Sequence, residues 1–129
     1  QILPRHFHYE KTEDIINRCG GTLCVEVWNS KPESEGYAVD YESDVTVYCD
    51  GMKVTVPAGG VVKVTNGNSI TLTPYIYHRF YAEGGELIVG EVSKVNDDAK
   101  DNHFSEETHH SIEEDEPVRH LLCGGYVME

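Results

Sequence analysis

Basic side chains are scarce in this sequence. There are 10 Lys and Arg against 23 Asp and Glu in 129 residues, which gives a formal net charge of −13. A protein that binds nucleic acid or an anionic membrane surface needs a basic face, so this balance argues against both kinds of partner. It is compatible with a neutral small ligand or with a cation.

Long hydrophobic runs and paired cysteines are missing too. No apolar run approaches the roughly 20 residues of a membrane span, and no signal-peptide pattern opens the chain. The cysteines form no CxxC pair, and a chain of this length can bury a core without disulfides. We therefore expect free thiols and a cytoplasmic location. The cysteines are Cys19, Cys24, Cys49 and Cys123.

A sustained helical period is also lacking. Residues 10–18 (EKTEDIINR) could form a short helix, but Ile15 and Ile16 alone make a weak apolar stripe. Short β-type runs dominate instead, separated by turn residues such as Asp50-Gly51, which predicts a tight hairpin. Their spacing of about ten residues predicts an all-β sandwich or barrel. The candidate strands cover residues 22–28, 44–49, 52–56, 61–65, 69–73, 77–82 and 86–92.

The two ends of the chain differ from this strand-rich middle. Residues 96–116 are acidic and rich in His and Asn, but residues 117–126 are apolar again, so we expect an ordered excursion over the barrel. Ile2-Leu3 reads like the middle of a strand. We therefore expect one domain over residues 1–129 that lacks its native N-terminal strands.

The sharpest local motif is His6-Phe7-His8. Residues two apart in a strand point to one face, so both imidazoles would enter the same space. Glu13 follows after a turn that lets the chain return beside that strand, and His78 after a proline turn is the natural fourth ligand. Such a set suits a first-row divalent metal. The alternatives without a metal are an exposed pair at His6 and His8 and a core histidine at position 78.

Several segments together resemble the D-lyxose isomerase family of cupin sugar isomerases. The resemblance implies a cupin double-stranded β-helix, which is a small jelly-roll barrel, and members that are longer at the N-terminus. One departure is Tyr75, where the family usually has a glycine after the proline. The segments are HFHYEKTEDIINR, SDVTVYCDG, VTVPAG, SITLTPYIYHRF, AEGG, VGEVSKVNDD and IEEDEP.

The same resemblance implies an activity and a ligand set. The expected reaction is the interconversion of D-lyxose and D-xylulose, and of D-mannose and D-fructose, by a homodimer. The expected cofactor is Mn²⁺, with Co²⁺, Fe²⁺ or Zn²⁺ as other candidates. The metal ligands implied are His6, His8, Glu13 and His78.

An aldose–ketose isomerase must move a proton between C1 and C2, which calls for an acid–base pair. Lys11 lies between two of the implied ligands, so it is tethered near the metal. The resemblance places a catalytic glutamate in the acidic run of residues 112–116, and we favour Glu113 over Glu114. Most lysines and acidic runs are simply solvated, and that reading stands beside this one.

Three further residues are candidates for binding the sugar. Glu91 alternates with Leu87 and Val89, so its carboxylate would point into the barrel, where burial is costly unless the charge is used. Asp97 could accept sugar hydroxyls or merely form an Asx turn. Arg119 could brace the acidic pocket or pair with a surface carboxylate.

Two other functions use a cupin of this kind. One is a non-haem iron dioxygenase with the same ligand set, and the other is a non-enzymatic sugar-binding module. Lys11 and the acidic tail favour the isomerase, because an oxygenase needs no such acid–base pair.

Overall fold

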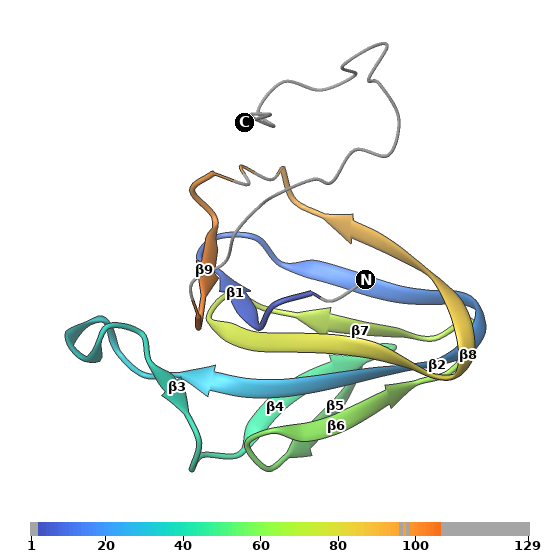
Figure 1. The fold of residues 1–129 in the computed structure, drawn as a ribbon, viewed down its shortest axis with the longest axis horizontal. Coiled ribbons are helices and arrows are strands. Elements are labelled where there is room, and N and C mark those ends of the chain that lie inside the picture. Colours follow the sequence, from blue (N-terminus) through green and yellow to red (C-terminus); the bar gives the residue numbers. More distant parts are fainter. Residues whose placement is uncertain (1–2, 96, 98, 107–129) are drawn as a thin grey trace.

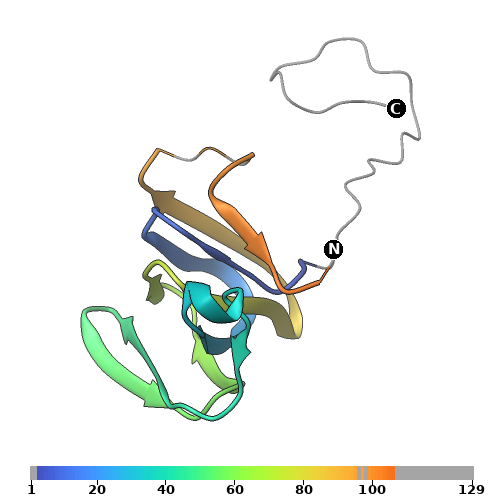
Figure 2. The same cartoon turned by 90° about the vertical axis from the view of Figure 1, so that its left-hand side faces the viewer.

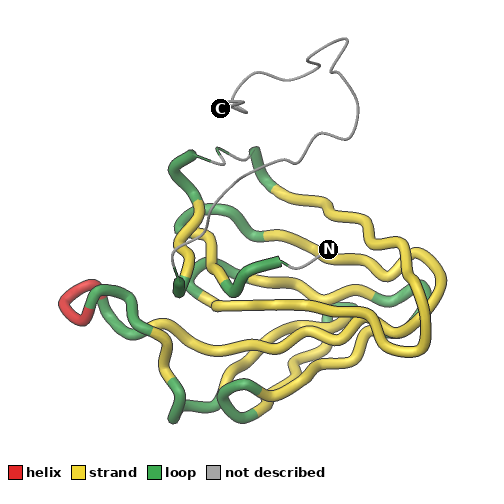
Figure 3. The backbone as a smooth tube through the Cα atoms, viewed as in Figure 1, coloured by secondary structure: helices red, strands yellow, loops and turns green. Residues whose placement is uncertain are grey.

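The computed structural model describes residues 3–95, 97 and 99–106, and nearly all of them lie in strands or short loops. Apart from the single turn η1, the described chain contains no helix, and so no helix able to cross a membrane (Figure 3). The elements are β1 His6–His8, β2 Glu13–Ser30, η1 Glu33–Glu35, β3 Val39–Asp40, β4 Val45–Cys49, β5 Met52–Val56, β6 Gly60–Val64, β7 Ser69–Leu72, β8 Ile76–Ser93 and β9 Asn102–Phe104.

These strands form one antiparallel sheet in the order β5-β4-β7-β2-β8-β1-β9, with β3 and β6 also paired to β2. The sheet is strongly curved but does not close (Figure 1). The β4–β5 hairpin and β9 lie at its two ends (Figure 2). The predicted all-β class is confirmed, and the arrangement is consistent with a cupin jelly roll.

Two strands of 18 residues each, β2 and β8, form the backbone of the sheet. They pair with one another along almost their whole length and bend together at the right of Figure 1. The predicted separate strands 77–82 and 86–92 are therefore one strand, and residues 22–28 are only part of β2. The gap between these two predicted strands, residues 83–85, is an irregularity inside β8, because pairing with β2 continues on both sides of it.

The bend depends on close backbone approach. Gly20 has φ 100°, and a Cβ there would lie 2.2 Å from the carbonyl oxygen of Glu86. The register of β2 against β8 shifts on both sides of this point. The buried Asn17 side chain holds the bend by donating hydrogen bonds to the carbonyls of Gly21 (2.8 Å) and Val64 (2.9 Å).

The segment 10–18 is not a helix. From Glu13 it runs in β2, with β7 on one side and β8 on the other, so its backbone groups are satisfied in the sheet. Glu13, Ile15 and Asn17 are buried in alternation, which is the period of a strand. Pairing with the neighbouring strands determines the conformation of this segment, because its own apolar pattern is too short to favour a helix or a strand.

The other local predictions agree more closely with the structure. The hairpin at Asp50-Gly51 is present, with φ 50° and 79°, the left-handed pair that a two-residue turn of this type needs. The thiols of Cys19, Cys24 and Cys49 are free. The remaining cysteine, the predicted excursion beyond residue 106, Glu113 and Arg119 all lie outside the described residues.

Two groups of buried side chains stabilise the sheet. The larger is aliphatic and comes mainly from β2, β4, β6 and β7, where it includes Leu23, Val47 and Ile70. The smaller is aromatic and contains Phe7, Trp28, Val39 and Tyr77. Strand β1 contributes Phe7 to the second group, and its two histidines lie on the opposite face of the strand.

Candidate metal centre

Strand β1 lies between β8 and β9, and this pairing brings three histidines together. His6 is directly opposite His78 in the antiparallel register of β1 and β8. His8 lies two residues further on, on the same face of β1. The three residues are 6%, 6% and 1% exposed in the order His6, His8, His78. Their coordinating nitrogens all lie within 4.8 Å of one another.

A turn connects the site to the start of β8. The backbone N–H of Tyr75 donates to the carbonyl of His8 at 3.0 Å, which ties the proline turn to the end of β1. Tyr75 adopts φ 65°, the left-handed conformation that favours glycine. Glycine would adopt this conformation without strain. The tyrosine ring that stands here instead packs against Phe7 at a ring distance of 5.4 Å.

Each histidine is oriented through its Nδ1 atom. Nδ1 of His6 lies 2.8 Å from the carbonyl of Pro4, that of His8 lies 3.1 Å from the carbonyl of Asp101, and that of His78 lies 3.1 Å from the carbonyl of Ile76. A carbonyl oxygen only accepts, so each Nδ1 carries the proton and each Nε2 keeps its lone pair. Three lone pairs therefore face one space.

Glu13 completes this arrangement from the first position of β2. Its Oε1 lies 3.3 Å from Nε2 of His8 and 3.1 Å from Nε2 of His78. Among the described residues, Nε2 of His78 is buried without a hydrogen-bond partner. Neighbouring ligand atoms around one octahedral cation are about 3 Å apart when each is about 2.1 Å from it. Acceptors that converge at this spacing without a donor between them fit a divalent cation.

The electrostatics keep these groups in their ligating forms. Burial, reinforced by the neighbouring His78, lowers the pKa of His6 to about 4, so its imidazole is neutral near pH 7. Burial by itself raises the pKa of Glu13, but the hydrogen bonds that a protonated His78 or His8 would donate to it outweigh burial and bring that pKa well below its usual range. A neutral imidazole and an ionised carboxylate are the forms that bind metals.

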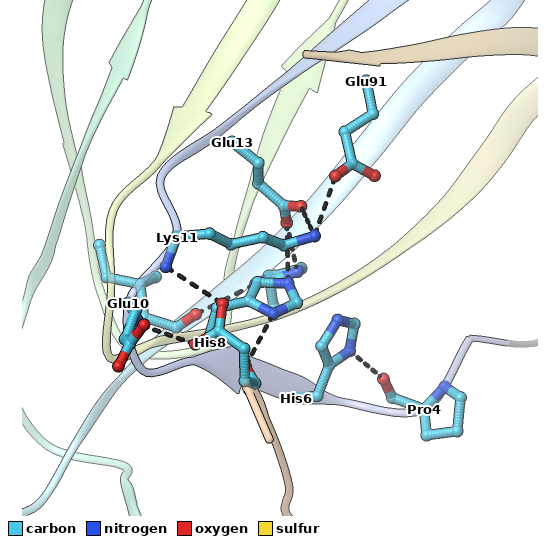
Figure 4. A network of polar contacts seen from close by, with 10 residues as sticks. Pro4, His6, His8, Glu10, Lys11, Glu13 and Glu91 are labelled. Carbon is cyan, nitrogen blue, oxygen red and sulfur yellow. Dashed lines mark hydrogen bonds and ion pairs between the residues drawn. The ribbon is translucent and has the colours of Figure 1, made fainter. Parts of the chain in front are cut away.

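Lys11 extends the cluster away from the histidines. It lies in the loop between β1 and β2, is 5% exposed, and places Nζ 3.2 Å from Oε2 of Glu13 and 2.9 Å from Oε1 of Glu91 (Figure 4). Burial lowers the pKa of Lys11, but the hydrogen bond to Glu91 and the charge of Glu13 outweigh it and raise that pKa. The ammonium group thus stays charged between two carboxylates.

The candidate sugar-binding residues are placed less uniformly. The Glu91 side chain is 44% exposed and directs its carboxylate to Lys11 (Figure 4). Asp97 lies in an exposed turn, where Oδ1 accepts the N–H of Ala99 at 3.1 Å, as in the Asx turn considered as its alternative. Glu113, Glu114 and Arg119 fall outside the described residues, so their roles stay predictions.

One residue of this neighbourhood carries no signal in the sequence. Asp101 is 6% exposed, and its carboxylate accepts the backbone N–H groups of Glu10 (2.7 Å) and Lys11 (3.2 Å). It lies 91 and 90 positions along the chain from these partners, within an acidic stretch that reads as a solvated surface. Only the pairing of β9 with β1 brings it to the site.

Comparison with known proteins shows which family the chain belongs to. The family model described as D-lyxose isomerase matches residues 1–126. A D-lyxose/D-mannose isomerase of Escherichia coli O157:H7 is 45% identical over 130 residues, and a D-lyxose/D-mannose isomerase of Serratia proteamaculans is 47% identical over 131 residues. Each alignment covers 98% of this chain and 56% of the relative. The chain thus spans about half the length of the curated relatives it matches, and by the match over nearly all of its residues it belongs to the D-lyxose isomerase family.

Proposed function

We propose that this chain carries the metal centre of an aldose–ketose isomerase that interconverts D-lyxose and D-xylulose, and also D-mannose and D-fructose. The observation that carries the proposal is the convergence of three histidine Nε2 lone pairs and the Glu13 carboxylate, with the Lys11 ammonium beside them. The names of the relatives from Escherichia coli O157:H7 and Serratia proteamaculans support the choice of sugars.

The proposed ligands are His6, His8, Glu13 and His78, and the proposed metal is Mn²⁺, with Co²⁺, Fe²⁺ or Zn²⁺ as alternatives. A bound divalent cation polarises the carbonyl and the adjacent hydroxyl of an open-chain sugar, which stabilises the negative charge that develops when the proton leaves carbon. The family and the histidine cluster support a metal without distinguishing among these ions.

In the proposed reaction two side chains of this protein handle the protons. The Glu113 carboxylate removes the proton from one carbon of the C1–C2 pair and returns it to the other. Lys11 Nζ, held charged at 2.9 Å from Glu91, donates a proton to the carbonyl oxygen and takes back the proton of the adjacent hydroxyl, so its charge is restored after each turnover. Its burial excludes water from this proton, so the transfer is directed to the sugar.

Three residues are proposed to hold the sugar. The carboxylates of Glu91 and Asp97 would accept its hydroxyl groups, and Arg119 would donate to them. Glu91 is partly exposed while it contacts Lys11, so one side chain can face both the ligand space and the proposed acid. A homodimer is proposed as well, and a monomer in light scattering would contradict that part.

The test is isomerisation by metal-stripped and metal-reloaded protein, followed by NMR of the sugars. We expect conversion of D-lyxose and of D-mannose only after a divalent metal is restored. Mn²⁺ binding without conversion of either sugar would contradict the isomerase and favour a sugar-binding module. Conversion that persists after complete removal of metal would contradict the metal centre.

A matched pair of variants tests the proposed base. Glu113→Gln keeps the shape of the side chain but cannot accept a proton, so kcat should fall by about 10²–10⁴. Glu114→Gln is the control at the next position and should change kcat much less. The reverse order of effects would assign the role to Glu114.

A further inference from the structure

We propose that Asp101 is a positioning residue, which holds Lys11 with its side chain and the metal ligand His8 with its backbone. The proposal rests on the proposed function, because it assigns Asp101 a task in that same site. It concerns a residue in the segment between β8 and β9, far from the site in sequence.

The side chain of Asp101 fixes the loop that carries Lys11. One carboxylate oxygen accepts the N–H of Glu10 at 2.7 Å and the other accepts the N–H of Lys11 at 3.2 Å. Adjacent amides held by the two oxygens of one carboxylate cannot rotate independently. The direction in which the Lys11 side chain leaves the loop is therefore set by Asp101.

The backbone of the same residue orients a metal ligand. The carbonyl of Asp101 lies 3.1 Å from Nδ1 of His8, and this contact leaves the Nε2 lone pair free to face Glu13. Partners that fix the tautomer of a ligating histidine typically contribute about 10–100-fold to metal affinity. One residue thus controls the placement of a ligand and of the proposed acid.

Asp101 is itself held from both sides of the chain. Its N–H donates to the carbonyl of Asp97 at 2.8 Å, which closes the turn before β9. Its neighbour Asn102 is paired with His8 in the register of β9 against β1. The backbone contact to His8 should therefore survive a change of the Asp101 side chain, whereas the hold on Lys11 should not.

The burial of Asp101 argues against a carboxylate that has no role in the structure. Asp101 is 6% exposed in a chain of net charge −13, where a further buried negative charge is costly. Two charge-assisted hydrogen bonds from backbone N–H groups offset that cost. A role limited to loop stability is the competing explanation, and the experiment separates the two.

The test compares Asp101→Asn with Asp40→Asn. The side-chain amide introduced by Asp101→Asn would keep one acceptor oxygen but present its own N–H to the second backbone N–H, so one hydrogen bond is lost. Asp40 is the matched control, because its Oδ1 accepts the N–H groups of Glu42 (2.8 Å) and Ser43 (3.1 Å) in a turn outside the metal centre. Asp101→Ala, which removes both hydrogen bonds, serves as the second variant.

Three readouts follow each variant below its unfolding temperature. Hydrogen exchange of the backbone amides of residues 10 and 11 reports the loop without any need for activity. Mn²⁺ affinity reports His8. The kcat and KM for D-lyxose, measured per bound metal, are compared in the native and in the Lys11→Ala background.

We expect Asp101→Asn to speed exchange at residues 10 and 11 and to lower kcat by about 10–100-fold, since misplacing a reacting group by about 1 Å can cost up to about 100-fold. In the Lys11→Ala background it should lower kcat by less than about threefold, because residues that act through one another are not additive. Asp40→Asn should leave kcat unchanged.

An unchanged kcat per bound metal for both Asp101 variants would overturn the proposal. So would a fall in kcat by about the same 10–100-fold when Asp101→Asn is added to Lys11→Ala. Native protein that binds Mn²⁺ but converts neither sugar would instead contradict the proposed function. In that case faster exchange at residues 10 and 11 would still support the hold on Lys11, and unchanged exchange would overturn it.

Discussion

The two faces of strand β1 are equally buried but serve opposite purposes. On one face the nitrogens of His6 and His8 converge with that of His78 beside the Glu13 carboxylate. On the other face Phe7 is fully buried, and its ring lies 4.8 Å from that of Tyr77 and 4.9 Å from that of His103. Burial alone therefore does not distinguish a site from a core.

The difference lies in what the buried atoms require. The aromatic face is satisfied by ring packing together with the hydrogen bond that the Tyr77 hydroxyl donates, so its buried atoms require nothing further. The histidine face has acceptors directed at acceptors, which is unfavourable until a cation lies among them. We therefore expect substitutions on the histidine face to remove function and those on the aromatic face to remove stability.

The largest expected effect is on the histidine face. His78→Ala should lower Mn²⁺ affinity by more than about 100-fold, because losing a ligand should exceed the effect of losing one of its supporting partners. Sugar isomerisation should disappear with the metal, and both can be measured by metal analysis and the D-lyxose assay. A variant that keeps one Mn²⁺ per chain would contradict the assignment of His78 as a ligand.

Lys11→Ala should lower catalysis without lowering metal binding, although Lys11 lies beside the histidine face. Lysine donates no lone pair while it stays charged between Glu13 and Glu91, so metal content should be nearly unchanged. The kcat should fall by about 10²–10⁴. Lys11→Met, which keeps most of the volume, should give the same result, and near-normal turnover in both variants would show that the proposed acid is wrong.

Phe7→Ala should act on stability instead. Removing a fully buried phenyl ring costs about 3–5 kcal/mol of the free energy of unfolding. Urea denaturation of the metal-free protein measures this loss. The fraction that remains folded should still bind Mn²⁺, because the three histidines lie on the side of β1 opposite Phe7. Loss of metal binding without loss of stability would contradict the proposed difference between the two faces.

The smallest effect is expected from Tyr77→Phe. The hydroxyl of Tyr77 donates to the carbonyl of Tyr37 at 2.7 Å, and losing one such bond costs about 1 kcal/mol. Tyr48→Phe is the control, since Tyr48 is 42% exposed on β4 and should change stability little. Equal effects of the two substitutions would indicate that the Tyr77 hydrogen bond contributes nothing net.

Local patterns predicted the fold class and several strands well. The alternation in β4 and β5 and the turn at Asp50-Gly51 are short-range features, so residues a few positions apart contain the information. The lengths of β2 and β8 were not predictable in this way. Gly20 and the two glycines after Glu83 look like ends of strands, and only their mutual pairing shows that the chain continues through them.

The same division holds for the candidate site. The i, i+2 spacing predicted one face for His6 and His8, and the structure places His78 directly opposite His6. Their role as ligands is a proposal, as are the roles of Lys11 and Glu91. The ion pair of Lys11 with Glu91 had no local signal, since the two residues meet only where the β1–β2 loop passes β8.

The sequence by itself determined the properties that depend on composition and short spacing: a strongly acidic chain, an all-β fold, and two histidines on one side of a strand. The tertiary structure alone decided which groups face those histidines. It brought in His78 through β8, pinned Lys11 between carboxylates, and placed the buried Asp101 beneath the loop that carries Lys11. Contacts between residues so far apart in the chain are set by the register of the sheet, and that register depends on the packing of the whole domain.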